Sequence, residues 1–223
     1  MLLKKSMLLM IDTETTGIPS RHGAGVRPVQ IGALAMDRET GEEVSSFKLP
    51  LCPDVWVEGY EGAEKVHKLS RPWLEQNGYG MVAGWEKFTA WIKQVAEIPA
   101  YRGGQHFLSA WNVEFDRTIL LYWQRAANPG LKVEDKKWSS FTEGQFVARD
   151  GCAQHLYYEY LKSRGGTRQY KNTLSSALDH FQLPPQPVPH DALSDARAAA
   201  KVVWRIRLYG NADQALRQQC QAI

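Results

Sequence analysis

MLLMIDTETTG, residues 7–17, places five apolar residues directly before a polar turn that ends in glycine. This order is typical of a buried strand that stops near Asp12. Residues two apart on a strand face the same side, so Asp12 and Glu14 present two carboxylates to one spot, with Leu8 and Met10 behind them. Two such carboxylates are unfavourable unless a cation or a proton compensates them, so the stretch predicts an acidic site.

The composition indicates a cytoplasmic protein of one domain, or one domain with insertions. The chain has 223 residues, 43% of them hydrophobic, and a formal net charge of +3. That charge permits a nucleic-acid partner without requiring one. The three cysteines lie far apart without metal-ligand spacing, which suits a reducing compartment without disulfides. The apolar run near the N-terminus is too short for a signal peptide or a membrane span.

The order of elements predicts an α/β fold with a mixed five-stranded sheet flanked by helices. Three strands come first and make a meander, and strands and helices then alternate. Expected strands cover 7–12, 29–36, 44–51 and 107–111, with a short edge strand at 138–141. Expected helices cover 63–67, a short helix capped by Ser70, 85–96, 112–127, 152–163, 172–182 and 191–209. We interpret 1–223 as one domain whose residues 210–223 form a C-terminal extension with a short helix.

Two later segments match the acidic style of the first. Asp116, in WNVEFD at residues 111–116, lies in the first turn of a helix after a strand, where the helix dipole favours acids. The segment HDALSDA at residues 190–196 follows a proline-rich connector. His190 and Asp195 would lie about 140° apart on a continuous helix. They converge only if His190 stays in the connector and Asp195 lies in the first helical turns.

Each acidic segment also has an ordinary explanation on its own. The first acids could belong to a helix N-terminus capped by Thr13 or Thr15. Asp116 could be a surface acid favoured by the helix dipole. His190 could be a polar loop residue and Asp195 part of a solvated helix face. Together these explanations require four coincidences, which favours one shared site.

The three segments, taken in order, resemble the DEDDh-type 3′–5′ exonucleases, the group of the DNA polymerase III epsilon subunit and RNase T. The segments are DTETTG on the first strand, NxxFD at a strand–helix junction and HDAxxDA before the last helix, and the resemblance covers residues 7–209. The segment VHKLS at residues 66–70 is similar to a V-H-G-I-T-like segment of the family, with Lys68 where glycine is usual. The loops at 18–27 and 130–170 depart from the family pattern and leave the subgroup open.

The resemblance implies an RNase H-like fold with strand order 3-2-1-4-5 and a two-metal active site. Four acids would hold two Mg²⁺ ions, for which Mn²⁺ can substitute, and Asp12 would bridge both. The acids are Asp12, Glu14, Asp116 and Asp195. His190 would be the general base, and the product would be a 5′-mononucleotide. The chemistry agrees, because two divalent ions cancel the charge of four carboxylates and suit in-line attack on a phosphodiester.

Other residues are candidates for binding the substrate. Those next to the acids are Thr13, Thr15, Thr16, His67 and Asn112. The threonines suit a terminal 3′-OH, although simple turn chemistry explains them equally well, and a loop hydrogen bond explains His67 equally well. Asn112 also stands where it can cap the helix after the fourth strand. Cationic loop residues that could follow a phosphate backbone are Arg21, His22, Arg27, Arg164, Arg168 and Lys171, with a solvated surface as the simpler explanation for each.

The sequence therefore predicts a metal-dependent exonuclease acting on the 3′ ends of single-stranded DNA or RNA. Two alternatives stay open: an RNA-specific 3′ exoribonuclease, and an inactive nucleic-acid-binding or docking module of the same fold. Nothing in the sequence separates DNA from RNA, since this depends on how the pocket treats the 2′-OH. A DNA polymerase or another replication or repair protein is an expected partner, and no membrane is expected.

Overall fold

The fold is described from a computed structural model that covers residues 5–104, 106–130, 146–147, 152–166 and 171–221. The strands are β1 (Met7–Thr15), β2 (Pro28–Asp37), β3 (Glu43–Cys52), β4 (Tyr79–Gly80), β5 (His106–Ala110) and β6 (Phe146–Val147). The helices are α1 (Pro19–His22), α2 (Tyr60–His67), α3 (Arg71–Asn77), α4 (Met81–Ala96), α5 (Val113–Ala127), α6 (Ala153–Ser163), α7 (Leu174–His180) and α8 (Ala192–Gln221). A 3-10 turn, η1 (Gly23–Gly25), follows α1.

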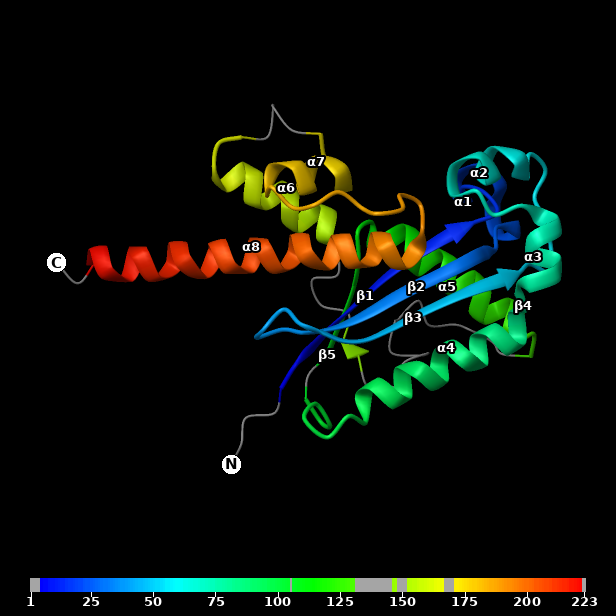
Figure 1. The fold of residues 1–223 in the computed structure, drawn as a ribbon, viewed down its shortest axis with the longest axis horizontal. Helices are drawn as coiled ribbons and strands as arrows, with labels where there is room; N and C mark the ends of the chain where they lie inside the picture. The colour runs from blue at the N-terminus through cyan, green and yellow to red at the C-terminus, as the bar shows by residue number, and fades with distance from the viewer. Residues whose placement is uncertain (1–4, 105, 131–145, 148–151, 167–170, 222–223) are drawn as a thin grey trace.

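One mixed sheet forms the centre of the fold, with strand order β4-β3-β2-β1-β5-β6 (Figure 1). Strands β1, β2 and β3 are antiparallel neighbours, and β5 joins β1 in parallel. The expected order 3-2-1-4-5 is confirmed, because β5 is the fourth long strand and the two-residue β6 takes the outer place. The two-residue β4 extends the sheet beyond β3 and was not expected. The edge strand expected at 138–141 falls outside the described residues.

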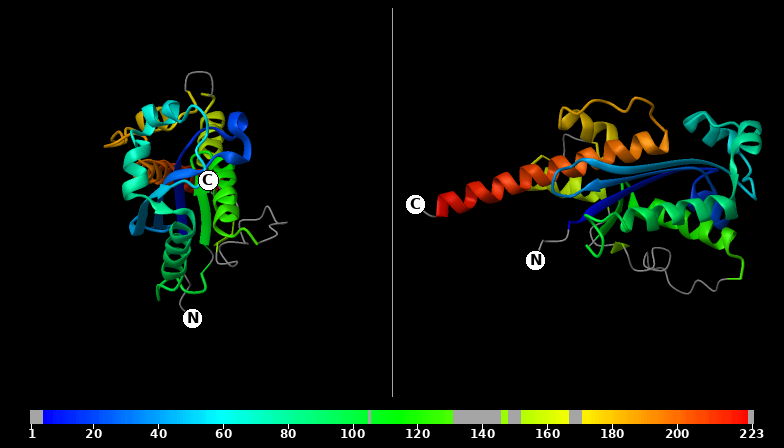
Figure 2. Two further views of the ribbon diagram at one scale, coloured as in Figure 1. Left: turned by 90° about the vertical axis from the view of Figure 1, so that its right-hand side faces the viewer. Right: turned by 60° about the horizontal axis from the view of Figure 1, so that its bottom comes forward.

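Alternation along β1 sends its side chains into two separate cores. Met7, Leu9 and Ile11 pack with α4 and α5, whose buried aromatic residues include Phe88 and Trp123. Leu8 and Met10 pack on the other face against the alanine-rich side of α8. Figures 1 and 2 show α4 on one side of the sheet and α8 on the other. Because residues of even number face α8, Asp12 and Glu14 continue the α8-facing row, as the sequence predicted.

Helix α8 is longer than the sequence suggested, and this corrects one expectation. Residues 191–209 and a separate helix at 211–223 were expected, whereas one helix continues from Ala192 to Gln221. Gly210 does not end it, since a glycine inside a helix costs only about 1 kcal/mol and no proline follows. The C-terminal part of α8 extends past the sheet in two views (Figures 1 and 2). Within the described residues, no helix has the length and apolar character that crossing a membrane requires.

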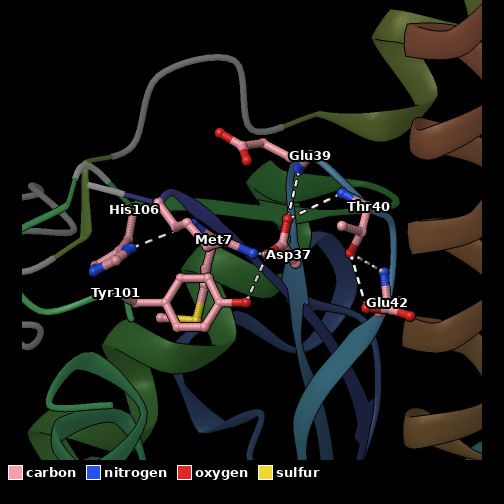
Figure 3. Close-up of polar contacts among 8 residues, drawn as sticks. Met7, Asp37, Glu39, Thr40, Glu42, Tyr101 and His106 are labelled. Atoms are coloured by element: carbon pink, nitrogen blue, oxygen red, sulfur yellow. Dashed lines mark hydrogen bonds and ion pairs between the residues drawn. The ribbon is translucent and has the colours of Figure 1, made fainter. Parts of the chain in front are cut away.

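A polar network closes the end of the sheet where β1 begins (Figure 3). Asp37 pairs with Met7 in the strand register and is 2% exposed. Its carboxylate accepts hydrogen bonds from Tyr101 Oη at 2.7 Å and Lys5 Nζ at 3.0 Å. The backbone amides of the turn after β2 also donate to it, at 2.7 and 3.0 Å. This buried carboxylate is therefore fully satisfied and ties β1, the β2–β3 turn and the α4–β5 connection together.

Candidate active site

The opposite end of β1 carries the first two acids on one face of the sheet. Asp12 pairs with Gly32 of β2, and Glu14 pairs with Gln30. Glu14 is 9% exposed and Asp12 is half-buried. Strand β1 continues through both acids to Thr15, so they belong to a strand and not to a capped helix start. The alternative explanation of these acids as a helix cap is therefore wrong.

Two residues of β2 bring α8 close to these acids. At Gly32 there is no space for a side chain, because an added Cβ would lie 2.1 Å from the Leu193 backbone nitrogen. Gln30 Oε1 accepts a hydrogen bond of 2.8 Å from the Ala192 amide, the first residue of the helix. The start of α8 is thus held directly over β2, beside Asp12. The sequence reasoning missed both residues, although a glycine inside an apolar strand is a signal of close backbone approach.

Helix α8 delivers the third motif to the same place. Glu14, His190 and Asp195 each offer a ligand atom, and these atoms lie within 4.8 Å of one another. His190 is exposed and lies before the helix with φ 58°, whereas Asp195 lies in the first turn of α8. This is the condition under which the two side chains were expected to converge. The structure thus brings residues 14, 190 and 195 together from two distant segments.

The fourth acid, Asp116, approaches from helix α5. It is 3% exposed, and Thr13 Oγ1 donates a 2.8 Å hydrogen bond to its carboxylate. Asp116 lies outside the 4.8 Å group, but its charge acts on both Asp12 and Glu14. Asn112 occupies the N-cap position of α5, as expected, but its side chain makes no capping bond; its carbonyl accepts from the Asp116 amide at 3.3 Å.

The four carboxylates are poorly compensated electrostatically. Burial, together with the charges of Asp195 and Asp116, raises the pKa of Glu14 to about 8. The pKa of Asp116 is raised to about 7, because the effect of burial exceeds that of the hydrogen bonds from Thr13, which lower it. The pKa values of Asp12 and Asp195 are raised by burial as well. Across the described part of the chain, no lysine or arginine forms an ion pair with any of the four.

A pocket of about 420 Å³ opens next to Glu14. Its walls are the end of β1, the α1 turn and the small residues of α2. The lining residues are Glu14, Thr15, Thr16, Gly17, Ile18, Arg21, His22, Gly59, Gly62, Ala63, Val66 and His67. The wall from α1 belongs to the loop at 18–27 that departs from the family pattern. An added Cβ at Gly17 would lie 2.6 Å from His22 Nδ1, so the exposed His22 ring would have to shift.

His67 lines this pocket, and the position of the proton on its ring is defined. Its Nδ1 accepts from the Leu69 amide at 3.1 Å, so the proton of the neutral ring is on Nε2. Burial lowers the pKa of His67 to about 4, so the ring is neutral near pH 7. The side chain is 7% exposed, and Nε2 faces the Thr15 backbone without a well-formed hydrogen bond. This N–H group is itself buried, so it does not face the open pocket.

The threonine hydroxyls have partners within the protein. Thr15 Oγ1 donates to the Gly17 carbonyl at 2.7 Å, and Thr16 Oγ1 accepts from the Arg27 amide at 3.0 Å. Thr13 Oγ1 donates to Asp116, as described above. Hydrogen bonds within the protein therefore explain the positions of all three threonine hydroxyls. Thr15 and Thr16 still line the pocket, and Thr13 and Asn112 do not.

The loop cations have different surroundings. Arg21 and His22 line the pocket. Arg27 forms an ion pair with Asp54, with Nε 2.7 Å from Oδ1, so its role is structural. Arg164 and Lys171 are not among the residues that line the pocket: Arg164 has its guanidinium over the Tyr160 ring, and Lys171 is exposed. Arg168 lies outside the described residues.

Comparisons with known proteins agree with this geometry. A family model described as exonuclease (RNase_T) matches residues 9–203. Cell-death related nuclease 4 superposes with a TM-score of 0.67 at 14% identity, over 92% of this chain and 64% of its own. E. coli exonuclease I in complex with a dT13 oligonucleotide gives 0.66 at 16% identity, over 92% and 43%.

The nuclease domain of 3′hExo, a DEDDh family member bound to rAMP, gives a TM-score of 0.64 at 15% identity, over 92% of both chains. At these identities the solved structures establish the RNase H-like exonuclease fold. The chain spans less than two thirds of the length of the first two proteins. No curated protein sequence matches the chain significantly.

Proposed function

The chain belongs to the exonuclease family, and on that premise we propose that it releases 5′-mononucleotides from the 3′ ends of single-stranded DNA or RNA. As a member of this family it is a hydrolase of nucleic-acid phosphodiester bonds. The direction of attack, the metal ions and the choice of substrate belong to the proposal.

The observation that carries the proposal is the cluster of uncompensated carboxylates. Four acids whose pKa values are raised meet at the end of β1 without a lysine or arginine ion pair in the described residues. Such a group needs positive charge from outside the chain. All-oxygen donors fit hard divalent cations, so Mg²⁺ suits the site and Mn²⁺ can replace it. Asp12, Glu14, Asp116 and Asp195 would hold two such ions.

When bound, the cations supply a water of lowered pKa and neutralise charge on the phosphodiester. The imidazole of His190 accepts a proton from the attacking water. Its position supports this role, because it is exposed, lies outside the helix and stands within 4.8 Å of Glu14 and Asp195 ligand atoms. Thr13 holds the Asp116 carboxylate from behind, which fixes the direction of its free lone pairs.

The pocket next to Glu14 suits the terminal nucleotide. His67 lines this pocket, so its neutral ring borders the place proposed for the terminal nucleotide. Gly59, Gly62 and Ala63 make the opposite wall shallow, which leaves space for a planar base. The peptide groups of Thr15 and Thr16 border the pocket near the acids, where a 3′-OH would lie.

DNA and RNA both stay within the proposal. Among the structural neighbours, one is complexed with dT13 and one with rAMP. The alternative of an inactive binding module is less well supported, because degenerate members should lack one or more of the five residues and this chain has all of them. A polymerase or another replication or repair protein stays a predicted partner.

The test uses 5′-labelled oligonucleotides: single-stranded DNA, duplex DNA with a 3′ mismatch, short RNA and tRNA. We expect a ladder that shortens from the 3′ end in Mg²⁺ or Mn²⁺, and no ladder in EDTA or with Asp12→Ala. An Asp12→Ala variant as active as the parent would contradict the proposal. A parent that binds divalent cations and single strands without cutting them would favour the binding module.

A further inference from the structure

Two side-chain contacts lie on either side of His190 along the chain. Before it, Gln186 Nε2 donates a 3.0 Å hydrogen bond to Asp195 Oδ1. After it, the Asp191 carboxylate forms an ion pair with Lys48 of β3. In the described part of the protein, the His190 ring itself has no hydrogen bond to another side chain or to the backbone. Its place must therefore come from the segments that bracket it.

The contact before His190 belongs to a stiff connector. Residues 184–189 read PPQPVP, and proline restricts such a segment to an extended conformation. Figures 1 and 2 show the connection from α7 running along α8 to the first turn of that helix. Gln186 is the only residue of this segment with an amide side chain, and that side chain is half-buried against Asp195. Its bond engages Oδ1, and a backbone hydrogen bond from His190 acts on the same carboxylate.

The contact after His190 fastens the same turn to the sheet. Asp191 Oδ1 accepts from the Ser194 amide at 3.0 Å and so caps α8. Its other oxygen, Oδ2, meets Lys48 Nζ, and the Asp191 side chain is only 18% exposed. One carboxylate thus joins the helix start to strand β3. Lys48 also neutralises a fifth acid that would otherwise add its charge to the four at the site.

We propose that Gln186 and Lys48 are positioning residues that hold Asp195 and His190 in their places, Gln186 directly and Lys48 through Asp191. This inference rests on the proposed exonuclease function. Neither residue needs to touch the substrate, because Gln186 acts through Asp195, a proposed cation ligand, and Lys48 acts through Asp191, the neighbour of His190. The two contacts together fix the position of the His190 turn, which hydrogen bonds to the imidazole ring do not do here.

The molecule offers a matched control for Lys48. Arg197 of α8 also pairs with an acid of β3, because its Nη2 lies 2.8 Å from Glu43 Oε1. This second ion pair joins the same helix to the same strand, further from His190. Arg197→Met therefore measures the general effect of losing an α8–β3 ion pair. Lys48→Met removes the pair that holds the turn, and Lys48→Arg restores the charge.

Kinetics on a single-stranded oligonucleotide form the first arm of the test. We expect Lys48→Met and Gln186→Met to lower kcat about tenfold with KM within about twofold, since partners of metal-site residues are worth about 10–100-fold. Lys48→Arg should regain most of the parent kcat, and Arg197→Met should keep it. Gln186→Glu, which faces Asp195 with a second negative charge, should weaken Mn²⁺ binding in calorimetry more than Gln186→Met does. Equal kcat losses in Lys48→Met and Arg197→Met would overturn the positioning role of Lys48.

Hydrogen exchange gives a second arm that does not depend on activity. Amides of residues 184–194 should exchange faster in Lys48→Met and Gln186→Met than in Arg197→Met. Unchanged exchange in this segment would overturn the proposal even if kcat falls. Faster exchange with parent-like kcat would overturn it as well, because the positions would not matter to the reaction. If the parent itself shows no 3′ ladder, the proposed function fails, and the exchange data still decide whether the two contacts hold the turn.

Discussion

The two ends of β1 carry carboxylates in opposite electrostatic situations. Beside Met7, Asp37 is buried, and although burial acts to raise its pKa, bonds from Tyr101 and Lys5 and from two backbone amides hold that pKa well below its usual range (Figure 3). Beside Gly17, burial and mutual repulsion raise the pKa values of Asp12 and Glu14. The pKa values of these acids therefore differ because Asp37 accepts hydrogen bonds from several donors, whereas Asp12 and Glu14 have other carboxylates as neighbours.

This difference separates a structural acid from a functional group of acids. Asp37 stabilises the fold as an anion, because each hydrogen bond to a charged group is worth about 1.5–3 kcal/mol. The cluster at the other end destabilises the folded chain unless protons or cations enter it. Stability alone does not explain why such a cluster is present, and binding of divalent cations does. The same substitution at the two ends should therefore have opposite effects.

The largest effect is expected for Asp12→Asn. Activity in Mg²⁺ should fall by more than about 100-fold, since even residues behind metal ligands are worth about 10–100-fold. In EDTA the same variant should melt higher than the parent, because one of four repelling charges is gone; about 1 kcal/mol corresponds to roughly 2–4 °C for a chain of this size. The advantage should shrink or reverse in Mg²⁺. Calorimetry in EDTA and in Mg²⁺ measures the two melting temperatures. A parent whose melting temperature does not change with Mg²⁺ would contradict the four-acid site.

Asp37→Asn should act in the other direction. It removes an anion that four donors satisfy, and we expect a loss of about 3 kcal/mol in the free energy of unfolding. Activity per folded molecule should stay close to that of the parent, because Asp37 lies at the far end of the strand. Urea unfolding followed by fluorescence measures the loss. Stability equal to that of the parent would show that the network in Figure 3 contributes little.

The sequence predicts what depends on local period and order. Strand alternation places Asp12 and Glu14 on one face, and the meander followed by alternating strands and helices predicts a mixed sheet. The order of its strands came only from the family resemblance. The convergence of His190 with Asp195 was predicted only as a condition on the start of the helix. That condition is met because His190 has φ 58° and Asp191 caps α8. A single sequence suffices for these features because each depends on neighbours along the chain.

The remaining features depend on contacts between distant segments. The approach of α8 to Gly32 and the ion pair of Lys48 with Asp191 join residues more than 100 positions apart, and no local pattern specifies them. The pocket wall from α1 also requires the fold. Lys68 shows the reverse case: it stands where the family has glycine, and the structure gives the reason for that glycine, a C-cap with φ 63°. The sequence alone shows that Lys68 departs from the family's glycine, but it does not show why glycine is usual at this position.

Gly32→Ala tests whether the acid end of the sheet requires the close approach of α8. The added Cβ would lie 2.1 Å from a backbone atom, so the helix start must move, at a cost of about 1–3 kcal/mol. Activity should fall more than tenfold, because Asp195 and His190 move with the helix. Gly210→Ala is the control: nothing lies within 4 Å of that position, and the change should raise stability by up to about 1 kcal/mol. A Gly32→Ala variant with parent-like kcat would show that the approach is not needed.

The pH dependence of stability gives the smallest and most specific test of the contrast. Glu14 has a folded pKa of about 8 against 4.5 for the free group, so between these values the folded chain holds a proton that the unfolded chain has lost. In EDTA stability should therefore fall as pH rises from about 5 to 8, by up to about 1.4 kcal/mol per pH unit for each such group.

Asp37 has the opposite sign, because its pKa is lowered: its contribution is complete above about pH 4 and is lost only in acid. Glu14→Gln should flatten the slope between pH 5 and 8, whereas Asp37→Asn should leave that slope unchanged and remove part of the loss below pH 4. Saturating Mg²⁺ should flatten the parent's slope too, since cations compete with protons for the carboxylates. A parent in EDTA whose stability is constant from pH 5 to 8 would mean that the acids at the end of β1 are not coupled through burial and repulsion.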